Sequence, residues 1–341
     1  MFLIIGLWGS RSRKIYAAYQ FFVYTLLGSV LVLLCFLTIY FHIGSSSFDY
    51  FNSSHFYTNR MLLFIIFMFI GFSVKVPIIP FHIWLPEAHV EAPTPGSVIL
   101  AGILLKLGIY AMIRLILGLF PFVSCDLIFI FLTIALIGFT YASLVALNQI
   151  DIKKIIAYSS IAHMNFSLLG MFSGSLLGLS GTYFLMFGHA LTSGALFLGI
   201  GVLYDRYKTR LIFYYGSLVI FMPLYSVIYF ILILSNFGFP GTMNFIGEFL
   251  ILAGALSYSS ITVIVSTFPM VLTLIYSLFL YNRIFFGSLQ ELFIRYYCDC
   301  TRLEFFIMGS LGLLVILFGL YPMSILSLSF PSLMKMSIIL I

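Results

Sequence analysis

Charged residues are scarce in this sequence. Of 341 residues, 16 are Lys or Arg and 10 are Asp or Glu, so charged side chains make up only 8% of the chain, whereas hydrophobic residues make up 62%. An ordinary soluble domain carries about 25% charged and about 45–50% apolar residues. This chain has too few polar groups to cover a water-facing surface, which excludes a soluble enzyme. We therefore expect an all-α integral membrane protein.

Cysteine and the common cofactor-binding motifs are also nearly absent. The four cysteines, Cys35, Cys125, Cys298 and Cys300, are too few and too scattered for a disulfide scaffold, a zinc site or an iron–sulfur cluster. The sequence contains no GxxxxGKS/T phosphate loop and no GxGxxG dinucleotide motif. We expect no metal or cofactor on this chain, so another subunit has to supply the energy for any transport.

Long uncharged stretches are abundant. A membrane-spanning helix needs about 20 mostly apolar residues. The stretches between charged residues that meet this length are Ile15–Phe48, Leu127–Ile150, Ile155–Tyr204, Leu211–Gly247, Phe249–Asn282 and Phe305–Met334. Ile155–Tyr204 is long enough for two helices, and Met61–Leu85 and Pro93–Phe120 are further spans with an internal lysine. The sequence predicts about nine full spans, and Met1–Gly9 is typical of the end of a tenth.

Alternating the sides of these spans separates the basic residues into two unequal groups. One face receives Arg11, Arg13, Lys14, Lys153, Lys154, Arg206, Lys208, Arg210, Arg283, Arg295 and Arg302, and the other receives Arg60, Arg114 and Lys335. Loops rich in Lys and Arg stay on the cytoplasmic side of a membrane or its mitochondrial equivalent, the matrix. The asymmetry therefore supports the span count and predicts the orientation.

Two predicted spans contain helix breakers. Pro77 and Pro80 interrupt the second span, and Gly238, Pro240 and Gly241 interrupt the seventh. A bilayer tolerates a broken helix only where protein or water satisfies the freed backbone groups. A packing kink is the plainer interpretation, but paired interruptions in the two halves of a transporter are typical of an ion site.

Five ionisable side chains lie well inside the predicted spans: Lys75, Lys106, His163, His189 and Glu248. A lysine or aspartate at mid-helix costs about 2.5–3.5 kcal/mol on insertion scales, so such residues usually mark a functional site. Burial drives lysine and glutamate toward their neutral forms, so both can exchange protons near neutral pH, as histidine does. The pattern predicts a proton path, although a lone helical histidine can also simply hydrogen-bond a neighbouring helix.

Four titratable residues lie near a predicted helix end. We expect His82, His89, Glu87 and Glu91 to make capping or loop contacts rather than to belong to the path.

Long motifs in the sequence resemble one family. Lys75–Thr94 reads KVPIIPFHIWLPEAHVEAPT, and Ser97–Tyr110 reads SVILAGILLKLGIY. Further matching stretches are Arg13–Thr25, Asp151–Met164, Gly188–Ala190 and Asn244–Phe249. Together they are similar to subunit 4 of proton-pumping NADH:ubiquinone oxidoreductase, respiratory complex I (subunit M in bacteria), nearly end to end.

The resemblance implies an antiporter-like bundle of two inverted repeats. Residues 1–120 would be the remainder of the first repeat, 121–287 the second repeat, and 288–341 a C-terminal loop and last span. The five buried ionisable residues would carry protons, coupled to NADH oxidation and ubiquinone reduction elsewhere. NADH, FMN, iron–sulfur clusters and ubiquinone would bind to partner subunits, among them antiporter-like neighbours of the subunit 2 and subunit 5 type. Lipids surround such a subunit, and no nucleic acid is expected.

One feature of the family is missing. Family members carry a glutamate on the helix that Met1–Gly9 would end, and here that position falls before Met1. Either another polypeptide supplies the missing helices and the glutamate, or the start is reduced and the site altered. We favour a separate chain, because Lys75 is retained and would otherwise lack its counter-charge.

Two other functions compete with proton pumping. One is a non-pumping structural subunit of the same membrane arm, and the other is a subunit of an Mrp-type cation/proton antiporter or a related membrane complex. The high content of Phe (39 residues) and Tyr (22 residues) is typical of an A+T-rich genome. We therefore expect a multi-pass protein of the mitochondrial inner membrane, with its basic loops on the matrix side.

Overall fold

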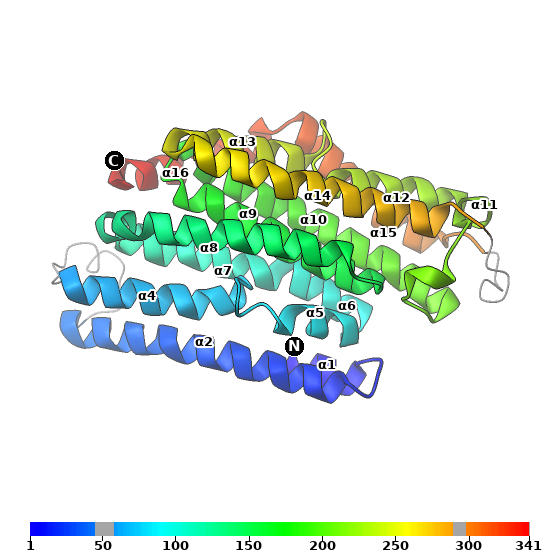
Figure 1. Ribbon diagram of the computed structural model, residues 1–341, viewed down its shortest axis with the longest axis horizontal. Coiled ribbons are helices and arrows are strands. Elements are labelled where there is room, and N and C mark those ends of the chain that lie inside the picture. Colours follow the sequence, from blue (N-terminus) through cyan, green and yellow to red (C-terminus); the bar gives the residue numbers. More distant parts are fainter. Residues whose placement is uncertain (45–57, 289–297, 341) are drawn as a thin grey trace.

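The computed structural model describes residues 1–44, 58–288 and 298–340. Within these ranges the chain is helical and forms no β-strand; an isolated antiparallel bridge pairs Asp151 with Leu211. The long helices lie side by side, roughly along one direction, and form a bundle (Figure 1). The predicted all-α membrane fold is confirmed.

The long helices match the predicted spans. Seven helical segments are long and apolar enough to cross a membrane. They are α2 (Lys14–Ile43), the continuous segment Thr94–Leu117, α8 (Pro121–Leu147), α9 (Ile152–Phe172), α10 (Leu176–Tyr207), α14 (Ser260–Phe285) and α15 (Arg302–Leu320). Shorter elements are α1 (Phe2–Trp8), η3 (Ile212–Tyr214), α11 (Leu218–Phe221) and α16 (Met323–Leu340).

Two further spans are each built from two helices that follow one another along the bundle. The first consists of α4 (Thr58–Lys75) and α5 (Trp84–Glu91), and the second of α12 (Pro223–Asn236) and α13 (Met243–Tyr258). Figure 1 shows α5 continuing beyond α4, and α13 and α12 occupying opposite ends of one line. With these two broken spans, the described residues give the nine spans that the sequence predicts.

The centre of the bundle is formed by α9 and α10. In the most apolar 18-residue stretch of α9, 94% of the residues are buried inside the bundle. The corresponding share is 78% for α10 and only 22% for α2 and for α15. Polar residues on α9, such as Ser159, Asn165 and His163, therefore face protein rather than lipid. Such burial is expected because an unpaired polar group in hydrocarbon costs several kcal/mol.

The basic residues gather at one end of the bundle. The α1–α2, α8–α9 and α10–α11 connections, the last turn of α14 and the first turn of α15 lie at this end, hereafter the basic end, and the α9–α10 turn lies at the other (Figure 1). Contacts between these connections, such as Arg206 with Glu304 across 2.7 Å, agree with the arrangement. Arg295 lies outside the described residues, as do the side chains of Arg60 and Lys335.

Two predicted span boundaries are wrong. Phe249–Asn282 was expected to be one helix, but Ser259 has extended backbone angles, ends α13 and caps α14 through its side chain. Likewise, Phe305–Met334 divides at Tyr321–Pro322 into α15 and α16. Charges served as boundaries in the prediction, whereas Glu248 lies inside α13 and an uncharged serine marks the real turn.

Candidate functional site

The two helix breaks are partly buried: Val76 and Asn236 are buried, whereas Pro80 and Phe239 are exposed. The helix α4 ends at Lys75, and α5 begins at Trp84 after a series of turns that includes a cis peptide bond before Pro80. The indole nitrogen of Trp84 donates a hydrogen bond to the carbonyl of Val74 (2.9 Å), which satisfies one group freed by the interruption. The second interruption, between α12 and α13, contains Gly238 and Gly241 in left-handed conformations.

A buried acid–base contact lies beside the second interruption. Nδ1 of His163, on α9, lies 3.7 Å from Oε1 of Glu248, on α13, and both residues are buried. The backbone of Asn236, the last residue of α12, also lies close enough to His163 to interact with its ring. The broken helix thus offers this histidine both a carboxylate and a freed carbonyl group.

Gly238 is required by two independent features of the second interruption. Its φ of 73° is a left-handed angle that costs other residues about 1–2 kcal/mol. A Cβ at this position would also collide with the carboxyl group of Glu248. The glycine therefore lets the backbone come close to the carboxylate that faces His163.

His189, on α10, continues the line from His163. The two imidazole rings lie 5.0 Å apart between centroids, at an interplanar angle of 36°. His189 is completely buried, and neither of its ring nitrogens has a hydrogen-bond partner among the described residues; the same is true of Nε2 of His163. Buried nitrogens of this kind normally bind ordered water, so we expect water next to both rings.

Lys106 lies on α7 (Leu105–Ala111) between two π-helical segments, η1 (Leu100–Leu104) and η2 (Met112–Leu117). Its ammonium group donates a hydrogen bond to the carbonyl of Ala101, five residues earlier. π-Helical segments are frequent at functional sites because they free backbone groups for other partners. Lys106 lies within electrostatic range of His163 and His189 and borders a hollow of about 250 Å³.

Lys75 is separate from the other four residues. It is half-buried at the C-terminal end of α4, where its Cβ packs against Gly108 of α7. Among the described residues its ammonium group makes no hydrogen bond or ion pair. The structure therefore brings His163, His189, Glu248 and Lys106 together. Lys75 is connected to this group only through its contact with Gly108, two residues after Lys106.

A cluster of buried charges at the basic end was not predicted as part of a site. Lys153 and Arg210 are 3% and 1% exposed, although the sequence suggested solvated loop charges. Lys153 donates a hydrogen bond to the carbonyl of Ala92 (2.9 Å), and Arg210 donates to the carbonyl of Val90. Burial raises the pKa of the nearby Asp151 carboxyl, and Arg210 opposes this rise.

One of the expected capping or loop contacts is wrong. His82 lies in the turns before α5, as expected, whereas His89 lies inside α5, whose cap residues Ile83 and Ala92 receive no side-chain cap. His89 is completely buried and stacks on Phe197, because α5 packs into the bundle as the second half of a broken span. Glu91 is also buried, whereas Glu87 forms a surface ion pair with Lys154 (2.9 Å).

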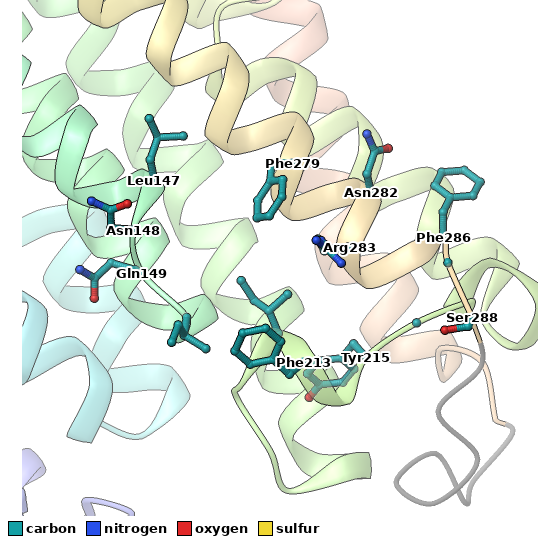
Figure 2. A pocket seen from close by; sticks show the side chains of 14 residues that line it. Leu147, Asn148, Gln149, Phe213, Tyr215, Phe279, Asn282, Arg283, Phe286 and Ser288 are labelled. Carbon is teal, nitrogen blue, oxygen red and sulfur yellow. The ribbon is translucent and has the colours of Figure 1, made fainter.

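A separate hollow of about 560 Å³ opens at the basic end between the ends of α8 and α14. Figure 2 shows Leu147, Asn148 and Gln149 on one side, Phe279 and Arg283 of α14 above, and Phe213 and Tyr215 below. The guanidinium group of Arg283 lies 5.3 Å from the Phe279 ring. No residue of the predicted path lines this hollow, so we assign it no part in the path.

The arrangement defines a class of protein: a helical membrane bundle in which buried acids and bases line two interrupted helices. The chain belongs to the NADH:quinone oxidoreductase/Mrp antiporter family of transmembrane proteins, whose sequence model matches residues 1–273. The predicted resemblance to subunit 4 is confirmed by relatives named NADH-ubiquinone oxidoreductase chain 4. The relative from Marchantia polymorpha is 50% identical over 322 residues, and the one from Dictyostelium citrinum is 49% identical over 292 residues.

These relatives are longer than this chain. The Marchantia alignment covers 94% of this chain but 65% of the relative, and the Dictyostelium alignment covers 84% and 70%, respectively. The chain thus spans about two thirds of the length of the curated relatives it matches.

Solved structures share the fold. A chain of respiratory complex I from Thermus thermophilus with bound NADH superimposes with a TM-score of 0.92 at 27% identity, covering 99% of this chain and 72% of that one. A chain of the Mrp complex from a Dietzia species superimposes with a TM-score of 0.87 at 19% identity, covering 96% and 69%. At that identity the second match supports the fold alone.

Proposed function

We propose that this chain translocates protons as an antiporter-like subunit of the membrane arm of respiratory complex I. Partner subunits would carry the NADH, FMN, iron–sulfur clusters and ubiquinone, and their redox reaction would supply the energy. The observation that carries the proposal is the buried contact between His163 and Glu248 beside a broken helix, with His189 and Lys106 close to it.

Each residue of this group suits a proton relay. Glu248 can accept a proton as a carboxylate and release it as an acid, and His163 can do the same through Nδ1, which faces the carboxylate. Among the described residues, His189 offers two ring nitrogens without hydrogen-bond partners, and Lys106 supplies a half-buried ammonium group at the start of the line. Water bound at these nitrogens would bridge the gaps that exceed hydrogen-bond length.

The interaction energy of one pair of charges is large enough to move a proton against the membrane potential. Two unit charges about 4 Å apart interact by about 4 kcal/mol at an effective dielectric constant of 20. Moving one charge through 100 mV requires about 2.3 kcal/mol. A change of charge at Glu248 can thus displace a proton at His163, 3.7 Å away, against a membrane potential.

Lys75 is the second element of the proposal. It lacks a counter-charge within the described residues, and exposed apolar residues such as Leu3 and Leu7 on α1 leave a face on which further helices can pack. We propose that an acidic side chain pairs with Lys75 from helices outside this sequence, carried by another polypeptide or by a preceding part of the same protein.

The positions of the two helix breaks support a division of the chain into two repeats. The interruption after Lys75 and the interruption before Glu248 occupy corresponding places in residues 1–120 and 121–287, which we propose as the remainder of one inverted repeat and a complete second repeat. The segment 288–341 would add the C-terminal loop and last span.

We place the protein in the mitochondrial inner membrane, with the basic end facing the matrix. Its neighbours would be antiporter-like subunits of the subunit 2 and subunit 5 type, together with lipids. The location is supported by the basic residues gathered at one end of the bundle and by the relatives' names.

Two substitutions in the assembled complex test the proposal. Glu248→Gln and Lys106→Met remove an ionisable group with little change of volume, and Lys208→Met makes the same change at an exposed position of the basic end. We expect the first two to lower the number of protons translocated per NADH oxidised, measured in sealed vesicles, and Lys208→Met to leave it unchanged.

The same experiment separates the competing functions. Unaltered proton translocation in an intact assembly carrying Glu248→Gln and Lys106→Met would indicate a structural subunit. Identification of the co-purifying chains decides between complex I, which would bring NADH- and quinone-binding subunits, and an Mrp-type antiporter.

A further inference from the structure

His89 is a buried titratable residue that the proposed path does not use. It lies on α5, is 0% exposed, and its ring stacks on Phe197 with centroids 4.4 Å apart and an interplanar angle of 2°. Neither of its ring nitrogens has a hydrogen-bond partner among the described residues. A packing role alone would be filled better by an apolar ring, because two unsatisfied polar atoms in this position cost free energy.

The C-terminal end of α5 fixes the position of His89 between two lysines. The carbonyls of Val90 and Ala92 accept hydrogen bonds from Arg210 and Lys153, as expected for cations at the negative end of a helix. These hydrogen bonds hold Lys153 near His89, on the side of the basic end. Both Lys153 and Lys106 lie within electrostatic range of the His89 ring. His89 in turn acts electrostatically on His189.

A hollow opens at the basic end beside the C-terminal end of α5. It has a volume of about 400 Å³ and is lined by Glu91 and Asp151, two carboxylates that face Lys153 electrostatically. Val90, the residue after His89, also lines it. Lys153 thus lies within electrostatic range of the two carboxylates of the hollow and of His89, and His89 lies within electrostatic range of His189 and Lys106.

We propose that His89 is a proton relay between the hollow at the basic end and the buried group of Lys106, His189, His163 and Glu248. One ring nitrogen would take up a proton from the side of Lys153 while the other nitrogen releases a proton toward His189. The ring is neutral before and after the step, and its N–H has passed from one ring nitrogen to the other. This inference rests on the proposed function and assigns the route by which the buried group exchanges protons with the basic end.

The test compares His89→Gln and His89→Phe in the assembled complex with His82→Gln as the matched control. His82 lies on the same segment, is also buried, and contacts Tyr141 edge-on rather than the relay. Glutamine keeps hydrogen-bonding groups and cannot carry a proton as histidine does, whereas phenylalanine keeps the stack on Phe197. We expect both His89 variants to lose as much proton translocation per NADH oxidised as Glu248→Gln does, and His82→Gln to keep the unsubstituted value.

Each outcome decides between the two proposals. If His89→Gln translocates protons at the unsubstituted ratio while Glu248→Gln does not, the relay role of His89 is wrong and the proposed function stands. If His89→Gln and Glu248→Gln both translocate protons at the unsubstituted ratio, the relay role of His89 and the proposed function are both wrong. If His89→Gln prevents assembly while His82→Gln assembles, His89 has a packing role and the relay is overturned.

Discussion

Substitution of Gly238 offers a test of the geometry at the second helix break. In Gly238→Ala the new methyl group would meet the carboxyl group of Glu248, and the backbone angle φ of 73° would become strained. The strain amounts to about 1–2 kcal/mol. The carboxyl group is the end of a flexible side chain, so it can move aside at little further cost in stability.

The cost appears instead in proton transfer. To restore an ordinary contact, the Glu248 carboxyl group has to shift by about 1 Å, and a misplacement of that size can slow a reaction by about 100-fold. The contact of 3.7 Å with His163 would change accordingly. We expect Gly238→Ala to lower the proton translocation rate by roughly 10- to 100-fold in an assembled complex.

Gly241→Ala is the matched control. Gly241 belongs to the same interruption and has φ of 92°, so alanine is strained there as well, but apart from its chain neighbours no atom of the described residues lies within 4 Å of the added Cβ. Proton translocation in sealed vesicles and thermal denaturation of the purified complex would be measured for both variants. We expect comparable losses of stability and a transport defect in Gly238→Ala alone; equal transport in the two variants would refute the role of the Gly238–Glu248 contact.

Two further predictions concern stability and surface chemistry. A Cβ at Gly181 would lie 2.7 Å from the backbone nitrogen of Ile251. Gly181→Ala should therefore force α10 and α13 apart and destabilise the protein by about 1–3 kcal/mol. In the control Gly194→Ala, the added Cβ meets a side chain of the described residues at 3.7 Å, so the melting temperature should not fall. Burial raises the pKa of the Cys300 thiol to about 11, so at pH 8 only about one thiol in a thousand is a reactive thiolate. Maleimide labelling of Cys300, followed by mass spectrometry, should therefore be slow at pH 8 and rise about tenfold per pH unit up to its pKa; fast labelling at pH 8 would contradict the raised pKa.

The spans and breaks were predictable because their causes are local. Apolar length determines a membrane helix, and proline or glycine interrupts it wherever it stands, so Pro80 and Gly238 marked the interruptions in the sequence. The division between α13 and α14 was missed because it depends on Ser259, an uncharged residue that occurs equally well inside a helix.

The buried group was predictable only in part. Lys106, His163, His189 and Glu248 stood out because ionisable residues are rare in apolar stretches. The contact between His163 and Glu248 joins residues 85 positions apart, a distance that no local pattern encodes, and the π-helical segments around Lys106 arise from packing.

Burial at the basic end was missed for a related reason. Lys153 and Arg210 read as loop charges because their positions suit the positive-inside rule. Their burial follows from carbonyls at the end of α5, more than 60 residues away in the chain. His89 was misread together with them, since its stack on Phe197 also joins distant segments.

The most direct test of the proton path is to observe water in the assembled complex. A cryo-EM map that resolves ordered water should show a continuous hydrogen-bonded chain linking Lys106, His189, His163 and Glu248, with water bound to the ring nitrogens that lack protein partners. A dry, closely packed interior between Lys106 and Glu248, with no water at His189, would contradict the account.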